Sequence, residues 1–90
     1  MLTSAERKAL KAKAHKLEPV VRIGAKGLTE EVIAEIDRAL RAHELIKVRA
    51  GAMERAARDQ VFDSICDKTR AEAVQQVGKV CVLYRKKADE

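Results

Sequence analysis

The loop Gly24-Ala25-Lys26-Gly27 contains the residue types in this sequence that are best suited to a chemical task. It follows a β-branched run and leads directly into an amphipathic segment, which predicts a strand-to-helix turn. Two glycines let the main chain approach a ligand and present amide N–H groups, while Lys26 and the following helix N-terminus favour an anion. The loop is therefore a candidate phosphate site. The alternative is a tight turn in which both glycines serve backbone geometry alone.

A row of cations along the first predicted helix forms a second candidate. Arg7, Lys11 and His15 recur every fourth residue, with Lys8 beside them, although like charges at that spacing destabilise a helix by roughly a few tenths of a kcal/mol per pair. The alternative is an ordinary solvated helix face. We predict that this row and the loop contact one ligand together with further cations on or just after the predicted strands, namely Arg22, Lys47, Arg49 and Arg85.

The charge of the chain is concentrated near its beginning. Residues 1–27 carry seven Lys and Arg against two Glu, whereas residues 28–90 carry twelve basic and twelve acidic side chains. This asymmetry predicts a polyanionic partner. No apolar run approaches the roughly 20 residues of a membrane span, and no signal peptide is recognisable. We expect a soluble, cytoplasmic protein that forms one domain over residues 1–90.

The motifs of catalysis and metal binding are missing from the sequence. The loop lacks the spacing and the hydroxyl of a P-loop, and it lacks the third glycine of a dinucleotide fingerprint. His15 and His43 lie on different predicted helices, with no nucleophile motif beside either. Cys66 and Cys81 form no Cys-x-x-Cys pair, and their apolar surroundings suit buried thiols in a reducing compartment. We expect no enzymatic activity, no cofactor and no bound metal.

The small number of aromatic residues narrows the kind of nucleic-acid recognition. Phe62 falls on a predicted core stripe, which leaves Tyr84 as the one aromatic side chain for contact with a base. A platform that stacks several bases is therefore excluded, and recognition must depend mainly on phosphates and shape. This favours a folded RNA. A base over Tyr84 is the alternative to a partly buried strand residue, which we favour for this side chain.

Three helices are predicted from capping residues and a period of 3.6. The first begins after Thr3, with Glu6 in capping-box spacing, and runs to about residue 17, burying Leu10, Ala14 and Leu17. The second begins after Thr29 and ends near residues 43–44. The third spans about residues 53–68. The expected core positions of the last two helices are Val32, Ile33, Ile36, Ala39, Leu40, Ala57, Val61, Phe62, Ile65 and Cys66.

Four strands are predicted at about residues 19–24, 45–50, 73–77 and 80–85. The last two flank Gly78-Lys79, which suggests an antiparallel pair joined by a tight turn. The element order α-β-α-β-α-β-β predicts one α/β domain with a four-stranded mixed sheet.

The sequence resembles the bacterial YhbY proteins, the stand-alone form of the CRM domain, an RNA-binding module of plant organelle splicing factors. The resemblance covers nearly the whole chain and is weakest between residues 51 and 76. The segments that carry it are Leu2-Thr3, Glu6-Arg7-Lys8, Ala14-His15-Lys16-Leu17, Pro19-Val20-Val21, Ile23-Gly24-Ala25-Lys26-Gly27-Leu28-Thr29, Glu35-Ile36, His43-Glu44-Leu45-Ile46-Lys47-Val48-Arg49 and Gly78-Lys79-Val80-Cys81-Val82-Leu83-Tyr84-Arg85.

The resemblance implies a fold similar to the C-terminal domain of translation initiation factor three. It also implies that the loop of residues 24–27, analogous to that of KH domains, contacts RNA, and that the protein acts with precursors of the large ribosomal subunit. We therefore expect a monomeric, non-enzymatic protein that binds ribosomal RNA and assists ribosome assembly. The alternatives are a small basic adaptor for an acidic protein and a nonspecific nucleic-acid-binding protein, because phosphate contacts alone do not distinguish DNA from RNA.

Overall fold

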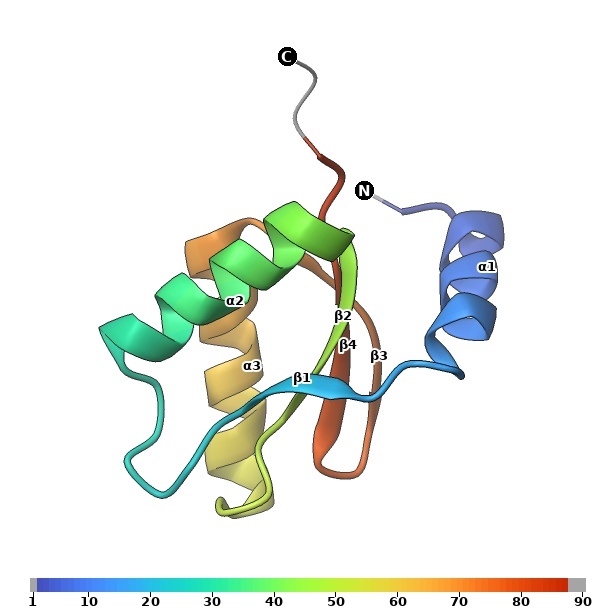
Figure 1. Ribbon diagram of the computed structural model, residues 1–90. Helices are drawn as coiled ribbons and strands as arrows, with labels where there is room; N and C mark the ends of the chain where they lie inside the picture. The colour runs from blue at the N-terminus through green and yellow to red at the C-terminus, as the bar shows by residue number, and fades with distance from the viewer. Residues whose placement is uncertain (1, 88–90) are drawn as a thin grey trace.

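The computed structural model describes residues 2–87 and contains the elements in the predicted order. Figure 1 shows three layers, with helix α1 on one face of a sheet and helices α2 and α3 on the other. The four-stranded mixed sheet confirms the predicted fold class. The elements are α1 (Ser4–Ala14), β1 (Pro19–Arg22), α2 (Glu30–His43), β2 (Leu45–Arg49), α3 (Arg55–Thr69), β3 (Glu72–Val77) and β4 (Val80–Tyr84).

The sheet has the strand order β1-β2-β4-β3. Strands β1 and β2 are parallel, with Arg22 opposite Arg49, and α2 connects them because a parallel pair cannot be joined by a tight turn. Strand β4 is antiparallel to β2 and to β3. The predicted hairpin is confirmed, and its turn has Gly78 at φ +57°, in the left-handed region that glycine adopts without strain.

Strands β1 and β2 end slightly before the predicted residues 24 and 50, but their hydrogen bonding continues. The Ile23 N–H donates to the Arg49 carbonyl at 2.8 Å, and the Ala50 N–H donates to the Lys79 carbonyl at 2.8 Å. The chain therefore stays attached to the sheet until the loop at residues 24–27 begins.

Helix α1 starts as predicted and ends earlier than predicted. Thr3 and Glu6 form the expected capping box, but the helix stops at Ala14, and the Leu17 N–H donates to the Ala14 carbonyl at 3.0 Å in a turn. Pro19 opens β1 and restricts the residue before it to extended conformations, so the chain must leave the helix before residue 18. Leu17 is consequently 37% exposed, and its predicted place in the core is wrong.

Helix α2 agrees with its prediction. The Thr29 hydroxyl accepts a hydrogen bond from the Val32 N–H at 3.2 Å, which satisfies one of the free donors of the first turn. Ile36 and Leu40 are fully buried. The last residue before β2, Glu44, adopts φ +63° and donates its N–H to the Leu40 carbonyl at 2.9 Å, which ends the helix.

Helix α3 begins at Arg55, two residues after the predicted start. Phe62 and Ile65 are buried as predicted, whereas Ala57 is exposed. Ala57 lies five positions before Phe62 in the helix, which places it about 140° away around the axis, outside the buried stripe. Thr69 replaces it in the core, where its hydroxyl donates to the Ile65 carbonyl at 2.6 Å.

Two hydrophobic clusters lie on opposite faces of the sheet. The larger one packs α2 and α3 against the sheet and includes Ile36, Leu40 and Phe62. The smaller one packs α1 against it through Ala14, Val74 and Val82, with Leu2, Leu10, Leu45 and Tyr84 partly buried around them. Tyr84 is thus the partly buried strand residue that the sequence favoured.

Candidate nucleic-acid interface

Residues 24–27 form a β-turn between β1 and α2, in which the Gly27 N–H donates to the Gly24 carbonyl at 3.0 Å. The two glycines differ in what the backbone requires of them. Gly27 adopts φ +76°, which a side chain would strain. Gly24 has no positive φ, and a Cβ built on it would meet nothing within 4 Å. The geometry of the turn therefore requires glycine at position 27. It does not require glycine at position 24, so the presence of Gly24 needs a reason other than backbone conformation.

Three loops meet at one end of the sheet, which we call the loop end. They are residues 24–27, residues 51–54 and the β3–β4 turn, and Figure 1 shows them at the end away from the two described chain ends. Contacts join them: a Cβ on Gly27 would lie 3.9 Å from Met53 Cε. A Cβ on Gly51 would lie 3.3 Å from Arg49 Nε and 3.7 Å from Lys79 Cδ. The side chains of Arg49 and Lys79 therefore both lie close to Gly51, in the loop of residues 51–54.

The loop end carries positive charges that favour a bound anion and negative charges that oppose it. Lys26 is exposed on the turn, and the partial positive charge of the α2 N-terminus follows it. Glu30 and Glu31 occupy the first turn of α2, so they stabilise the helix and also reduce the positive potential there. Binding of an anion at this end therefore needs the cations of the neighbouring strands as well as the loop.

The face of the sheet on the α1 side supplies those cations. Val21 and Val48 are buried in the larger cluster on the other face, so the adjacent Arg22 and Arg49 point toward the α1 side. Between α1 and this face lies a cavity of about 390 Å³, which we call the basic groove. It brings together four predicted site residues: Lys11, His15, Lys47 and Arg49.

Two further predicted site residues, Arg7 and Arg85, have hydrogen-bond partners within the fold. The Arg7 guanidinium donates to the Ala73 carbonyl at 2.6 Å and to the Val74 carbonyl at 3.2 Å, at the point where β3 has a bulge. Arg85 donates to Asp37 and Thr69 and lies at the opposite end of β4 from the loop end. Lys8 is exposed on α1, but it does not line the basic groove.

Lys79 is a cation of the loop end that the sequence did not suggest as a site residue. The tight turn at Gly78-Lys79 was visible in the sequence, but the approach of that turn to Gly51 depends on the strand order. The hydrogen bond from Ala50 to the Lys79 carbonyl could not be derived from local patterns. Local sequence patterns do not show that the β3–β4 turn lies beside the end of β2, so Lys79 was not predicted as a site residue.

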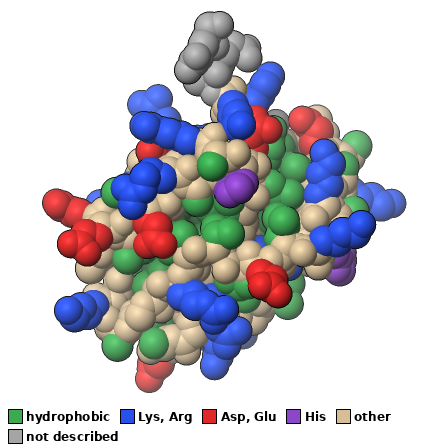
Figure 2. Space-filling view, in the orientation of Figure 1, with side chains coloured by type: hydrophobic (Ala, Val, Ile, Leu, Met, Phe, Trp, Pro, Cys, Tyr) green, Lys and Arg blue, Asp and Glu red, His purple; other side chains and the backbone are tan. Residues whose placement is uncertain are grey.

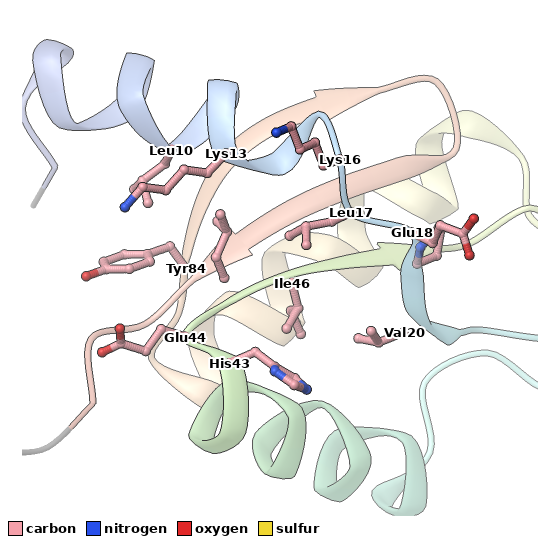
Figure 3. A pocket seen from close by; sticks show the side chains of 12 residues that line it. Leu10, Lys13, Lys16, Leu17, Glu18, Val20, His43, Glu44, Ile46 and Tyr84 are labelled. Carbon is pink, nitrogen blue, oxygen red and sulfur yellow. The ribbon is translucent and has the colours of Figure 1, made fainter.

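A larger cavity of about 690 Å³ lies between α1, the start of β2 and the end of α2. Figure 3 shows Leu17 at this cavity, with the ring of Tyr84 at one side and the buried Ile46 on the α2 side of β2. Figure 2 shows hydrophobic side chains exposed in the hollow between α1 and α2. Its lining includes Glu18 and Glu44 beside its basic residues. This mixture of charges makes it less suited to a polyanion than the basic groove.

The described residues offer little for metal binding or nucleophilic chemistry. Between residues 2 and 87, no group of three or more His, Cys, Asp or Glu side chains could hold a metal ion. Burial raises the pKa of the Cys66 thiol and raises the pKa of Cys81 to about 12, so both remain protonated and weakly nucleophilic at neutral pH. No helix in the same range is long and apolar enough to cross a membrane.

Comparison with known proteins places this geometry among relatives. The model of the CRS1/YhbY (CRM) domain matches residues 2–85. A probable RNA-binding protein of Pseudomonas aeruginosa is 44% identical over 94% of this chain and 82% of its own length. An RNA-binding protein of Haemophilus influenzae is also 44% identical, over 93% of this chain and 85% of its own length.

A solved structure supports the same assignment. The solution structure of a hypothetical protein of Staphylococcus aureus, described as a candidate RNA-binding protein, has a TM-score of 0.84 and 32% sequence identity to this chain. The match covers 99% of this chain and 93% of that one. The arrangement of layers and strands described above is therefore shared with this relative.

Proposed function

The chain belongs to the CRS1/YhbY (CRM) domain family, and from this premise we propose that it binds structured RNA through the loop at residues 24–27 and the basic groove. One observation carries the proposal: Lys11, His15, Lys47 and Arg49 come from a helix and a strand distant in sequence, yet they line one cavity. No acidic side chain is among the described residues of that lining. A cavity lined by cations and free of acidic side chains suits the phosphates of a nucleic acid.

The loop and the groove would contact successive phosphates of one strand. Exposed Lys26 offers a donor at the loop end, and Arg22 and Arg49 lie side by side on the parallel strands that lead to it. Phosphate contacts of this kind set the position of the RNA and carry no sequence information by themselves. We expect selection of RNA over DNA to come from the shape of the RNA and its 2′-hydroxyl groups.

The finer proposal is that the RNA is ribosomal RNA in precursors of the large subunit and that binding assists their assembly. The resemblance to YhbY proteins supports this choice of RNA. We further propose that the protein is a cytoplasmic monomer without enzymatic activity. In a cell lysate at low salt, we expect the protein to sediment with ribosomal precursors, and at high salt we expect it to be released from them. If it stays in the fractions of unbound proteins at both salt concentrations, the ribosomal role is contradicted.

A salt series tests the proposal for RNA binding directly. The affinity for a folded ribosomal RNA fragment should fall linearly on a log–log plot, with a slope of roughly −0.7 to −0.9 for each phosphate contact. Lys26→Ala and Lys47→Ala should each weaken binding and reduce the slope by about one contact. Lys68→Ala is the matched control, because Lys68 is an exposed lysine near the end of α3, on the other side of the sheet.

The alternatives predict different outcomes of the same series. A flat salt dependence would favour an adaptor for a protein partner. Duplex DNA that competes as well as folded RNA of equal length would instead indicate nonspecific binding of nucleic acids. Equal affinity of Lys26→Ala, Lys47→Ala and Lys68→Ala variants for the RNA would remove both the loop and the basic groove from the binding surface.

A further inference from the structure

The basic groove has an apolar floor that phosphate binding does not explain. Val77 is 63% exposed on β3, although valine gains nothing from contact with water. Helix α1 packs over Val74 and Val82 of this face, with Leu45 and Tyr84 at the edge of the contact, and Val77 lies outside the covered part. Two rows of cross-strand partners form the floor: Lys47, Val82 and Gln75 in the first, and Arg49, Val80 and Val77 in the second.

Each row begins with a cation on β2, continues with a valine on β4 and ends with an uncharged residue on β3. Lys47 and Arg49 lie on β2, while the valines and Gln75 lie on β4 and β3. Lys11 and His15 extend from α1 on the other side of the cavity. A ligand in the groove would therefore place an anionic part against β2 and α1 and a flat apolar part against β4 and β3.

The volume limits what the groove can hold. About 390 Å³ is near the lower end of the roughly 300–1,000 Å³ of small-ligand sites. This space matches the size of one base with its sugar. Because the cations lie at the side of the groove and the floor is apolar, one nucleotide turned out of an RNA helix matches both its size and its charge.

We infer that the basic groove is a subsite for one unpaired nucleotide of the RNA, an inference that rests on the proposed function. The base lies on Val80 and the exposed Val77, and the phosphates on either side contact Lys47 and Arg49. The half-buried amide of Gln75 carries a donor and an acceptor, and it hydrogen-bonds to the edge of the base. The protein thereby recognises an unpaired position in a folded RNA without a stacking aromatic side chain.

Two hairpin RNAs test this subsite. Both have the same stem and one single-nucleotide bulge, which contains uridine in one RNA and an abasic ribose in the other. The backbone, charge and position of the bulge are the same, so only contact with the base differs. We expect the wild-type protein to bind the uridine bulge about fivefold more tightly, which corresponds to roughly 40 Å² of apolar surface covered by the base at about 25 cal/mol per Å².

Adjacent glutamines on β3 provide matched variants. Gln75 lines the groove, whereas the Gln76 side chain donates to Asp59 at 2.7 Å toward α3. Gln75→Leu keeps the apolar volume and removes the amide, so it should reduce the fivefold preference while affinity for the abasic RNA stays the same. Gln76→Leu should leave the preference unchanged. Circular dichroism of both variants confirms that the fold is retained.

Each other outcome has a distinct meaning. Equal affinity of the wild-type protein for both hairpins, with a steep salt dependence, would overturn the nucleotide subsite and leave the proposed function standing. Absence of binding to either hairpin and to the folded ribosomal fragment would overturn the proposed function itself. Displacement of the uridine hairpin by polyglutamate as effectively as by unlabelled hairpin would show that the groove accepts an acidic protein segment, and would also overturn the subsite.

Discussion

The guanidinium of Arg85 donates to Asp37 twice, from Nη1 to Oδ1 at 2.7 Å and from Nη2 to the backbone carbonyl at 3.2 Å. Nη1 also donates to the Thr69 carbonyl at 2.8 Å. Arg85 follows β4, Asp37 lies in α2 and Thr69 ends α3, so one side chain joins three elements. This relationship gives Arg85 a structural role at the end of the sheet remote from the loop.

Replacement of Arg85 should therefore change stability and leave RNA affinity unaltered. Arg85→Ala removes hydrogen bonds to a partly exposed carboxylate and to two carbonyls, and we expect the free energy of unfolding to fall by about 2 kcal/mol. Urea denaturation measures this change. Lys86→Ala, at the exposed neighbouring residue, is the control and should stay within about 0.5 kcal/mol of wild type.

The same contact makes stability depend on acid pH. The hydrogen bond from Arg85 is the main cause that holds the pKa of Asp37 below its ordinary value of 3.8. A lower pKa in the folded state means that the contact stabilises the protein above pH 3.8, and that this stabilisation is lost as the pH falls through the folded value. Urea midpoints from pH 6 to about pH 2 should converge for wild type and Asp37→Asn; parallel curves would contradict this assignment.

The sequence predicted the elements that local patterns specify. Thr29 and a regular 3.6-residue period define α2, and the capping box of Thr3 and Glu6 defines the start of α1. The end of α1 was predicted about three residues too late. The chain turns toward β1 after Ala14, although no helix-breaking residue follows at position 15. The parallel pairing of β1 and β2 brought the predicted cations Arg22 and Arg49 together.

The roles of several cations could not be predicted because they depend on distant parts of the chain. Arg7 looked like another member of the basic row on α1, but its partners lie 66 and 67 residues away. The floor of the basic groove depends on the register that sets Gln75 opposite Val82. A bulge shifts that register, and local periodicity gives no sign of it.

Arg7 should contribute to stability through its contact with β3. Its guanidinium satisfies two carbonyls next to the bulge, where the ladder of hydrogen bonds is interrupted. We expect Arg7→Ala to lower the free energy of unfolding by about 1–2 kcal/mol. The adjacent Lys8 is exposed, so Lys8→Ala should have little effect. Equal stability of the two variants in thermal melts would contradict a structural role for Arg7.

The buried Cys81 thiol should react only when the protein opens. Burial raises the pKa of Cys81 to about 12, so almost no thiolate is present at pH 8, and solvent does not reach the side chain. In a Cys66→Ala variant, we expect Ellman's reagent to label Cys81 at the rate of unfolding, and to label it at once in guanidinium chloride. Rapid labelling of the folded variant would show that the core around β4 is accessible.

The two loop glycines separate the demands of folding from those of binding. Gly27 adopts φ +76°, so Gly27→Ala should lower the free energy of unfolding by about 1 kcal/mol or more. Gly24 has neither a positive φ nor a neighbour within 4 Å of an added Cβ. Gly24→Ala should therefore keep or slightly raise the melting temperature, because alanine restricts the unfolded chain.

RNA affinity gives the second measurement for the same pair. If the backbone at residue 24 approaches a phosphate, the methyl group of Gly24→Ala lies in the way, and affinity for the folded ribosomal fragment should fall although stability does not. This combination would be hard to explain by a change in folding. Wild-type affinity for Gly24→Ala would mean that the RNA keeps its distance from this part of the loop, and Lys26 would then contact the phosphate through its side chain alone.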